Sequence, residues 1–359
     1  MLNILRYLTF PFSLLYNFIT FLRNKCYDFK IFKAHTFKDL KIIAVGNLSV
    51  GGTGKTPHIE FLIKLLNTEF NGKIATLSRG YGRQTKGFRL VSSQNTSEEV
   101  GDEALQIKTK FPNTIVAVGE KRAVAIPQIL AQHPDYQLVL LDDAFQHRAI
   151  RADSQILLTD YRRLFTRDFV LPMGNLRESR KGYQRADIII VTKCPLGLKA
   201  AEKQQIIQEI RPLPQQKVFF SHLKYGSLYP LLSDFNLPKL NDNWSKSTTV
   251  LLVCGIARPQ YLVDYLAEKK GVKSLEKLLF RDHHAFKLGD LDLIQQKFEA
   301  IKTDNKIIIT TEKDAMRLLL HRKYLLQKAL PIYCLPIQVF FEEKKRILEL
   351  KKALLSFIK

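Results

Sequence analysis

The chain has 359 residues, 46% hydrophobic and 25% charged, so it is long enough to bury the cores of two domains and its composition excludes an intrinsically disordered protein. Lysine and arginine outnumber aspartate and glutamate by 56 to 34, and the net charge of +22 predicts a surface that attracts anions. The basic residues are spread along the chain without a nucleic-acid-binding motif, so we expect no nucleic-acid partner. The four cysteines form no C-x-x-C pair, which argues against a zinc site or a disulfide framework and favours a reducing, cytosolic compartment.

The first 27 residues contain no acidic residue, and the segment from Tyr7 to Leu22 is uncharged and mostly apolar. It is shorter than the roughly 20 apolar residues of a membrane-spanning helix, and no signal-peptide cleavage site follows it. An aromatic helix flanked by basic residues suits the interface of an anionic membrane. We therefore predict a membrane-associated helix over residues 1–27, kinked at Pro11. The alternative is a helix buried against the core of its own domain.

An apolar run from Lys41 to Val45 leads into a glycine-rich turn that ends in Lys-Thr. This is the pattern of a phosphate-binding loop, except that Ser49 stands at the first glycine position. The backbone N–H groups of such a loop, and the helix that follows it, bind a polyphosphate. We predict that Lys55 contacts the β- and γ-phosphates and that Thr56 contacts Mg²⁺. The predicted ATP-binding residues are Ser49, Val50, Gly51, Gly52, Thr53, Gly54, Lys55 and Thr56.

Strands and helices alternate after the loop. Apolar periodicity predicts a helix from about 56 to 66 and strands over 73–78, 114–119, 137–141 and 186–193. This order predicts an α/β fold with a mostly parallel, doubly wound sheet of the P-loop NTPase type. Ligands of such sheets bind at the carboxyl ends of the strands.

Acidic or basic residues follow two of these strands. Asp142 and Asp143 come after 137–141, where a carboxylate can hold Mg²⁺ opposite Thr56, although a capping or turn pair is the alternative. Thr192-Lys193 ends the strand 186–193 without the following aspartate that guanine-binding proteins use, which favours ATP over GTP.

Four prolines, at 212, 214, 230 and 238, mark an interdomain connection. A second α/β set follows, with strands over 248–254 and 306–311. The extended segment 331–339 is predicted to pair with 217–225, which sends the last helix back to the first domain. The predicted division is a P-loop domain over 28–216 with 340–359, linker strands over 217–229 and 331–339, and a smaller α/β domain over 230–330.

Three clusters outside the loop carry groups that can do chemistry. Asp102, which follows Gly101 before a predicted helix, is a candidate general base or a helix cap. Arg177 and Glu178 end a Pro/Gly loop and can contact phosphate and metal, or act only as scaffolding. The pair His283-His284 is more often a structural turn than a ligand.

Eight motifs, in this order, resemble the tetraacyldisaccharide 4'-kinase family. The resemblance runs from the N-terminal helix to near residue 340. The motifs are Val45–Pro57, Ser78–Gly82, Gly101–Glu103, Asp142-Asp143 with Phe145–His147, Leu176–Glu178, Gly255–Ala257, Asp282-His283 and Thr311–Ala315.

The resemblance implies a kinase with two α/β domains, a two-stranded linker, ATP and Mg²⁺ in the cleft, and peripheral attachment to the cytoplasmic face of the bacterial inner membrane. The implied substrate is a tetraacylated glucosamine disaccharide 1-phosphate, phosphorylated on its 4'-hydroxyl in lipid A biosynthesis. The implied partners are this lipid and the anionic membrane surface, without an obligate protein partner. Asp102, His283 and Lys55 would be catalytic; Thr56, Asp142, Asp143 and Glu178 would bind the metal; Arg79, Glu103, Arg122, Gln146 and Arg177 would contact the substrate.

Two other functions stay open. A soluble P-loop ATPase switch would share the loop and Asp142, but it would need neither the aromatic, basic N-terminus nor an acid–histidine pair. A membrane-docking nucleotide sensor would keep the N-terminal helix and tolerate loss of Asp102.

Overall fold

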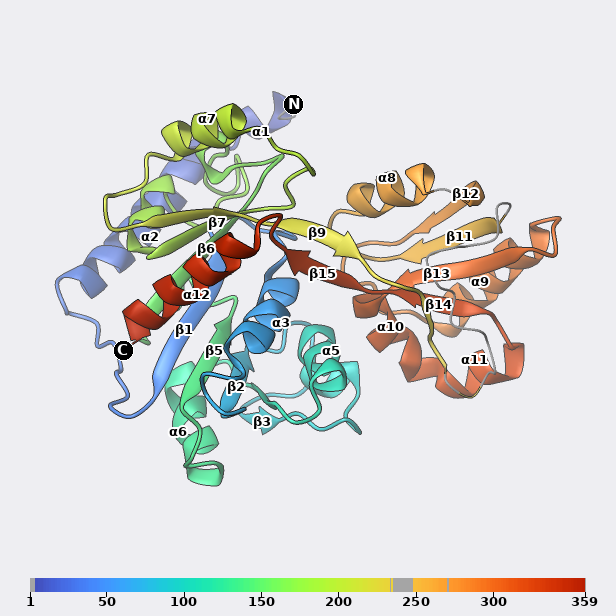
Figure 1. The fold of residues 1–359 in the computed structure, drawn as a ribbon, viewed down its shortest axis with the longest axis horizontal. Helices are drawn as coiled ribbons and strands as arrows, with labels where there is room; N and C mark the ends of the chain where they lie inside the picture. The colour runs from blue at the N-terminus through green and yellow to red at the C-terminus, as the bar shows by residue number, and fades with distance from the viewer. Residues whose placement is uncertain (1–3, 233, 235–247, 270, 359) are drawn as a thin grey trace.

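The structure is a computed structural model that describes residues 4–232, 234, 248–269 and 271–358. Two α/β domains lie side by side and are joined by a narrow pair of strands (Figure 1). Residues 1–3 of the predicted N-terminal helix, and 233, 235–247 and 270 of the predicted smaller domain, lie outside the described residues.

An eight-stranded sheet forms the first domain, in the order β3-β4-β2-β5-β1-β6-β7-β8. All neighbouring strands are parallel except β3 and β4. The α/β fold with a mostly parallel sheet is therefore confirmed. The strands are β1 (Lys41–Asn47), β2 (Ile74–Ser78), β3 (Arg89–Leu90), β4 (Ile115–Val118), β5 (Leu138–Asp142), β6 (Ser154–Asp160), β7 (Ile188–Thr192) and β8 (Lys217–Phe220).

Helices cover both faces of this sheet, which explains why its strands read as continuous apolar runs. Those of the first domain are α3 (Lys55–Leu66), α4 (Ser97–Val100), α5 (Asp102–Lys110), α6 (Arg122–Gln132), α7 (Ala200–Ile210) and α12 (Lys344–Ile358). The C-terminal helix α12 returns to the first domain, where Leu350, Leu354 and Ile358 are buried in one cluster with Ile43 and Val45 of β1.

A five-stranded sheet forms the second domain, in the order β10-β14-β13-β11-β12. Its strands are β10 (Tyr229–Pro230), β11 (Thr248–Cys254), β12 (Val272–Leu279), β13 (Lys306–Thr311) and β14 (Ile332–Leu335), and its helices are α8 (Gln260–Glu268), α9 (Leu288–Ala300), α10 (Glu312–Leu318) and α11 (Arg322–Lys328). The edge strand β12 was not predicted, because the charges of Lys273, Glu276 and Lys277 interrupt any alternating apolar pattern.

The connection between the domains is an antiparallel pair, β9 (His222–Tyr225) with β15 (Ile337–Phe340). The segments 217–229 and 331–339, which we predicted as linker strands, also supply β8 and β14 to the two domain sheets. Pro336 has no N–H to donate to a strand ladder, so β14 ends before it and β15 begins after it.

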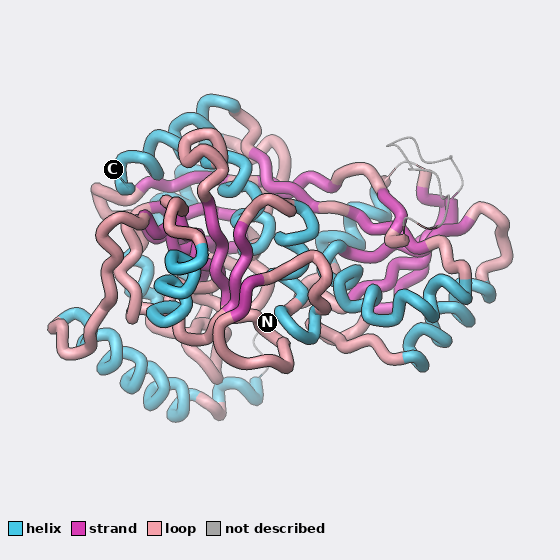
Figure 2. The backbone as a smooth tube through the Cα atoms, turned by 90° about the horizontal axis from the view of Figure 1, so that it is seen from below, coloured by secondary structure: helices cyan, strands magenta, loops and turns pink. Residues whose placement is uncertain are grey.

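Two helices, α1 (Ile4–Tyr7) and α2 (Phe10–Asp28), precede the first sheet, and α2 lies on the face of the first domain opposite α12 (Figures 1 and 2). Pro11 lies in the first turn of α2, and the predicted helix is interrupted just before it, between Tyr7 and Phe10. The kink predicted at Pro11 is therefore a break in the preceding turn, and proline is favoured in a first turn because the first N–H groups of a helix have no partner within it. No helix within the described ranges is both long and apolar enough to cross a membrane.

Polar side chains attach α2 to the first domain. Ser13 Oγ donates to the Val170 carbonyl at 3.2 Å, Tyr16 Oη donates to the Arg177 carbonyl at 3.0 Å, and Asn24 Nδ2 donates to Glu178 Oε2 at 2.8 Å. The apolar side chains of the helix point outward and remain exposed. They are Phe10, Phe12, Leu14, Leu15, Phe18, Ile19, Phe21 and Leu22. These side chains are therefore not part of the core of the domain, contrary to the buried-helix alternative.

Candidate active site

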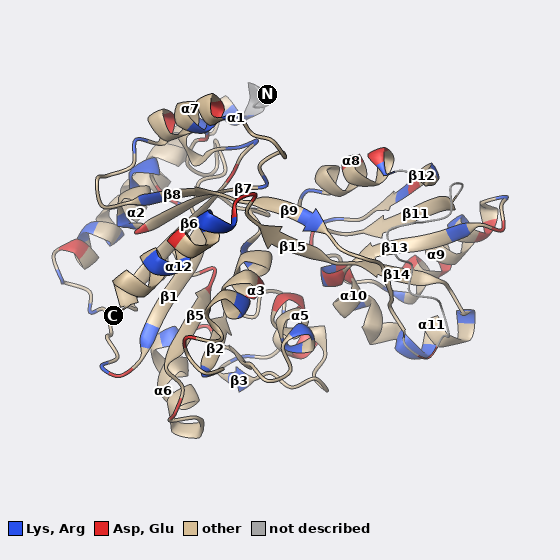
Figure 3. Ribbon diagram, viewed as in Figure 1, with Lys and Arg blue, Asp and Glu red and all other residues tan. Residues whose placement is uncertain are grey.

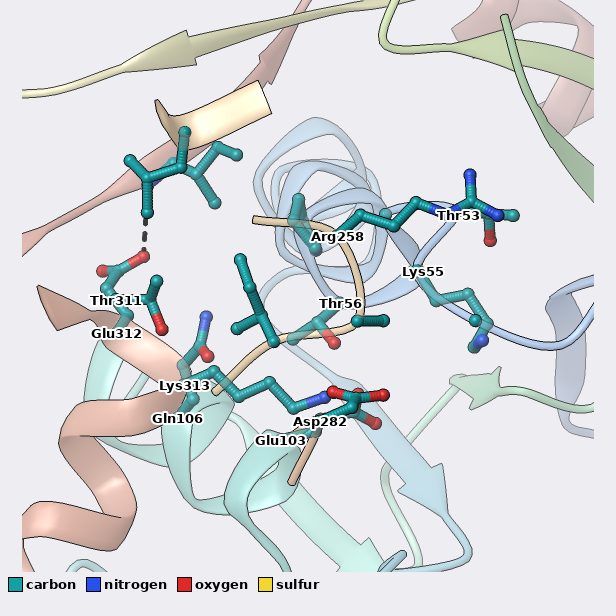
Figure 4. Close-up of a pocket in the computed structure, with 18 of the residues that line it drawn as sticks. Thr53, Lys55, Thr56, Glu103, Gln106, Arg258, Asp282, Thr311, Glu312 and Lys313 are labelled. Atoms are coloured by element: carbon teal, nitrogen blue, oxygen red, sulfur yellow. Dashed lines mark hydrogen bonds and ion pairs between the residues drawn. The ribbon is translucent and has the colours of Figure 1, made fainter. Parts of the chain in front are cut away.

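A cavity of about 470 Å³ lies between the domains beside the glycine-rich loop. Both domains and the linker line it. Among its lining residues are Val50–Pro57, Glu103, Asp143, Arg177 and Lys193 from the first domain, Leu223, Tyr225 and Ile337 from the linker, and Ile256–Arg258, Asp282, His283 and Thr311–Lys313 from the second domain. Figure 4 shows Lys55 and Arg258 near Thr53, and Lys313 pointing toward Glu103 and Asp282.

The glycine-rich loop connects β1 to α3 and is held in shape by one side-chain and one backbone hydrogen bond. Asn47 Nδ2 donates to Thr53 Oγ1 at 2.9 Å, and the Val50 N–H donates to the Asn175 carbonyl at 2.8 Å. Gly54 has a φ of +86°, a conformation in which any other residue would be strained. Lys55, the first residue of α3, is thereby placed at the positive end of that helix.

Thr192 and Lys193, at the end of β7, hold the backbone of this loop. Thr192 Oγ1 donates to the Thr53 carbonyl at 2.9 Å, and Lys193 Nζ donates to the Gly52 carbonyl at 2.5 Å. Lys193 Nζ also lies 3.1 Å from Asp160 Oδ2. These contacts give the pair a role in supporting the loop.

Asp160, at the end of β6, connects the two domains. It is 1% exposed, and it accepts from Arg258 at 2.9 Å and from Tyr261 Oη at 2.7 Å, both in the second domain. Burial opposes its ionisation, but Lys193, Tyr261 and Arg258 hold the pKa of Asp160 below its ordinary value. We predicted neither Asp160 nor its strand, although an acid after the apolar run Ile156–Leu158 is the same signal that identified Asp142.

Asp142 and Asp143 lie on β5 and just after it, next to β1. Asp142 is 1% exposed, and neither of its carboxylate oxygens has a hydrogen-bond partner in the described part of the chain. Burial and the nearby Glu103 carboxylate raise the pKa of Asp142 to about 7. Asp143 Oδ1 lies 2.7 Å from Arg177 and 3.6 Å from Lys55.

A buried carboxylate without a partner is costly unless a proton or a cation neutralises it. The unpaired Asp142 therefore fits a Mg²⁺ site. Across the described ranges no group of three or more histidine, cysteine or acidic side chains is placed to hold a metal ion alone. Mg²⁺ is commonly bound by one or two carboxylates together with substrate phosphates. Asp142 therefore fits a Mg²⁺ ion that binds together with a nucleotide.

Ionisation of Asp142 should destabilise the nucleotide-free protein as the pH rises. Its pKa is about 7 in the folded protein and about 3.9 in an unfolded chain. The folded state thus binds the proton more tightly, and the free energy of unfolding falls between these two values by at most about 4 kcal/mol. Urea unfolding at about pH 5 and about pH 8 should show that Asp142→Asn removes this fall, whereas Glu343→Gln, at an exposed position, keeps it. Equal pH dependence in wild type and Asp142→Asn would contradict the expectation.

Glu178, predicted as a metal ligand, lies under α2, outside the cavity lining. It is 1% exposed, and its oxygens contact Arg185 at 2.7 Å, Gln146 at 3.0 Å and Asn24 at 2.8 Å. Gln146, predicted as a substrate contact, also donates to the Asn47 carbonyl at 2.9 Å. Together the two residues connect α2 to the base of the glycine-rich loop.

Arg79 and Arg122, also predicted to contact the substrate, belong to a basic cluster around His147. Burial, and then the charges of Arg122, Arg23 and Arg79, lower the pKa of His147 to about 4. Arg122 is 3% exposed and its Nη1 donates to the carbonyls of Gly119 and Glu120 at 3.0 Å each. The Nε atoms of Arg23 and Arg122 have no hydrogen-bond partner among the described residues. This cluster is suited to attract an anion.

Asp102 and His283 meet across the domain boundary. Asp102, the first residue of α5, is 4% exposed, and its Oδ2 lies 3.1 Å from His283 Nδ1. Burial opposes ionisation, but His283, Lys313 and Arg317 keep the pKa of Asp102 below its ordinary value. Asp102 is therefore an ionised acceptor beside the cavity.

His283 is held in position by its backbone and its ring. Its φ of +56° is in the left-handed region, and its N–H donates to the Gly255 carbonyl at 3.1 Å. The ring packs edge-on against Tyr81, with the ring centres 4.6 Å apart. Backbone strain of this kind clusters at active sites.

Comparison with known proteins gave consistent matches. The family model described as tetraacyldisaccharide-1-P 4'-kinase matches residues 5–355. The tetraacyldisaccharide 4'-kinase of Bacteroides thetaiotaomicron is 42% identical over 338 residues, which cover 92% of this chain and 87% of that protein. The enzyme of the same name from Flavobacterium johnsoniae is 44% identical over 318 residues, covering 88% of each chain. The structure is also similar to the crystal structure of Aquifex aeolicus LpxK in complex with ATP, with a TM-score of 0.74 and 27% sequence identity. The match covers 99% of this chain and 100% of that one.

Proposed function

This chain belongs to the tetraacyldisaccharide-1-P 4'-kinase family, and from that premise we propose that Asp102 is the general base of its reaction. The chain is an ATP-dependent kinase that phosphorylates the 4'-hydroxyl of the lipid A disaccharide. The observation that carries the proposed mechanism is the 3.1 Å contact between Asp102 and His283. Because the two residues come from different domains, the pair exists only while the domains are together.

The glycine-rich loop and the carboxylates after β5 would bind the phosphates of ATP. Lys55 is placed to follow the γ-phosphate as it moves, and Arg177 keeps Asp143 in position at 2.7 Å. Thr56, Asp142 and Asp143 would hold Mg²⁺, which neutralises charge on the phosphates when bound. The contacts that occupy Glu178 make it a support for α2 and the loop in this proposal.

Asp102 would take the proton of the 4'-hydroxyl as the hydroxyl oxygen forms its bond to the γ-phosphorus and ADP leaves. Phosphoryl transfer has a loose transition state, so positioning and charge stabilisation supply most of the catalysis. His283 holds the Asp102 carboxylate in place during this step. Water is kept from ATP when the second domain covers the cavity.

The basic cluster around His147 is the proposed site of contact with the anionic substrate. Arg79 is exposed and Arg122 is buried beside it. Arg79 can therefore contact a phosphate of the substrate directly, while the buried Arg122 adds positive charge to the site. Arg23 of α2 belongs to the same cluster, which would connect membrane attachment to substrate binding.

Incubation with γ-³²P-labelled ATP and the lipid disaccharide, followed by thin-layer separation, tests the function. We expect label in a lipid bisphosphate. Label only in inorganic phosphate would support the ATPase switch, and binding of ATP without turnover would support the nucleotide sensor.

We also propose that α2 attaches the protein to the cytoplasmic face of the bacterial inner membrane without crossing it. In support, the polar side chains of α2 form hydrogen bonds to the first domain. On its other side, Phe12 is 66% exposed and Phe18 is 56% exposed. Lys25, Lys30 and Lys33 follow in the sequence, and Figure 3 shows lysine and arginine distributed over both domains. An apolar helix face with basic residues beside it binds anionic bilayers.

The double substitution Phe12→Ser and Phe18→Ser should weaken binding to anionic vesicles roughly 10-fold or more, because each ring gains burial only in the bilayer. Flotation of the protein with vesicles measures this, and thermal unfolding should be almost unchanged. Leu348→Ser is a matched control, since Leu348 is 59% exposed on α12, on the opposite face. Unchanged flotation would refute the membrane proposal, and failure of the variant to fold would assign α2 a structural role.

A further inference from the structure

Lys313 connects the acid–histidine pair to a second carboxylate. It lies in the first turn of α10 and lines the cavity. Its Nζ is 2.9 Å from His283 Nε2 and 2.9 Å from Glu103 Oε1. Figure 4 shows the side chain directed at Glu103 and Asp282. The ammonium group thus faces His283 from the side opposite Asp102.

The chemistry of these groups fixes where the imidazole proton lies. Burial opposes the charge on Lys313, but Glu103 and Asp102 keep the pKa of Lys313 above its ordinary value. A charged ammonium has three N–H donors and no acceptor. At the 2.9 Å contact, His283 Nε2 must therefore be the acceptor. A neutral imidazole with an unprotonated Nε2 carries its proton on Nδ1, which is the atom 3.1 Å from Asp102 Oδ2.

We propose that Lys313 is a positioning residue that holds His283 as its Nδ1–H tautomer, so that the ring presents an N–H to the Asp102 carboxylate. This inference rests on the proposed role of Asp102 as the base. With the other tautomer, a ring lone pair would face the carboxylate and push it away. While the ammonium covers Nε2, the imidazole cannot pass a proton onward, so the proton taken from the substrate stays on Asp102.

The groups around the ring support this arrangement. Glu103 accepts from Lys313 and so holds the ammonium in place. Arg317 Nε lies 3.7 Å from Asp102 Oδ2, and Asp282 Oδ1 lies 4.0 Å from His283 Nε2. Lys313 is nearer to Nε2 than Asp282 is, so it decides which nitrogen is protonated.

Long-range ¹H–¹⁵N NMR of the full-length protein labelled with ¹⁵N-histidine tests the proposal without turnover. The His283 signals are assigned by their loss in His283→Asn. We expect a single Nδ1–H tautomer in the wild type, a mixture of tautomers in Lys313→Met, and recovery of the single tautomer in Lys313→Arg. Lys323→Met, at an exposed position on α11, is the matched control and should leave the spectrum unchanged.

Kinetics provide the second readout. Lys313→Met should lower kcat roughly 10- to 100-fold, the range known for partners that orient a metal-ligating histidine, with little change in the KM for ATP. Lys313→Arg should recover most of this loss. An Nε2–H tautomer in the wild type, or an unchanged tautomer in Lys313→Met, would overturn the proposal. A rise in the KM for ATP without a change of tautomer would also overturn it, because Lys313 would then bind the nucleotide. Failure of the Asp102 proposal is detected separately, as normal turnover in Asp102→Asn.

Discussion

Lys55→Ala should lower kcat by roughly 10³-fold or more, because it removes the charge that we propose follows the γ-phosphate in the transition state. Loss of one such electrostatic contact costs several kcal/mol. The folded structure should be largely kept, since Lys55 pairs with Asp143 only at the long distance of 3.6 Å and Asp143 keeps its closer partner Arg177 at 2.7 Å. Steady-state kinetics with the lipid substrate and thermal unfolding measure the two effects.

Lys64→Ala is the matched control for this variant. Lys64 is on the same helix, α3, but at an exposed position, so its removal should leave turnover near normal. A Lys55→Ala enzyme that turns over at the wild-type rate would exclude the glycine-rich loop from the active site.

Asp102→Asn should lower kcat by roughly 10²- to 10⁴-fold, the range for loss of a general base, with little change in the KM for ATP. Asparagine has the same shape as aspartate and is equally favoured at helix starts. The variant therefore keeps the shape of the side chain but loses both its negative charge and its ability to accept a proton. Rapid-quench measurement of phosphoryl transfer would separate the chemical step from product release.

His283→Ala should lower kcat in the same direction. If the two residues act as one unit, the double variant should be scarcely slower than the slower single variant. Losses that multiply would mean two independent roles. Near-normal kcat in Asp102→Asn would leave Asp102 with the structural role of starting α5.

The residues that act through a local pattern could be predicted from the sequence. The glycine-rich loop is recognisable because its glycines and its Lys-Thr are adjacent in the chain. Asp142 followed an apolar run of ordinary length. The contact of Asp102 with His283 came only from the family resemblance, because no spacing rule relates residues on two domains.

The residues that act through tertiary contacts could not be predicted in the same way. Lys313 was part of a recognised motif, but its role depends on the distances to Glu103 and His283. Glu178 was predicted as a metal ligand from the family resemblance, whereas its Pro/Gly loop alone left contact with metal and scaffolding both open. Nothing in that loop reveals that Asn24, far earlier in the chain, uses one of its oxygens.

The orientation of α2 shows a similar limit. Hydropathy identifies a helix with many apolar side chains, and in most proteins these would face the core. Here Ser13, Tyr16 and Asn24 make the contacts with the domain. The predicted membrane-associated helix implied that the apolar side faces away from the domain, but three hydrogen-bonding residues among many aromatic ones carry too weak a signal to show which residues make the docking contacts.

The return of α12 to the first sheet has a consequence for biosynthesis. The second domain is inserted into the first, and the 15 residues of α12 are synthesised after that inserted domain. Until α12 has been synthesised, the core cluster around Ile43 and Val45 lacks Leu350, Leu354 and Ile358. Synthesis of the first domain therefore begins before that of the second domain, but its core is completed after it. Domains usually fold in the order of their synthesis. In this chain the inserted domain can finish folding first, while the nascent nucleotide-binding domain keeps an open apolar face for chaperones to cover.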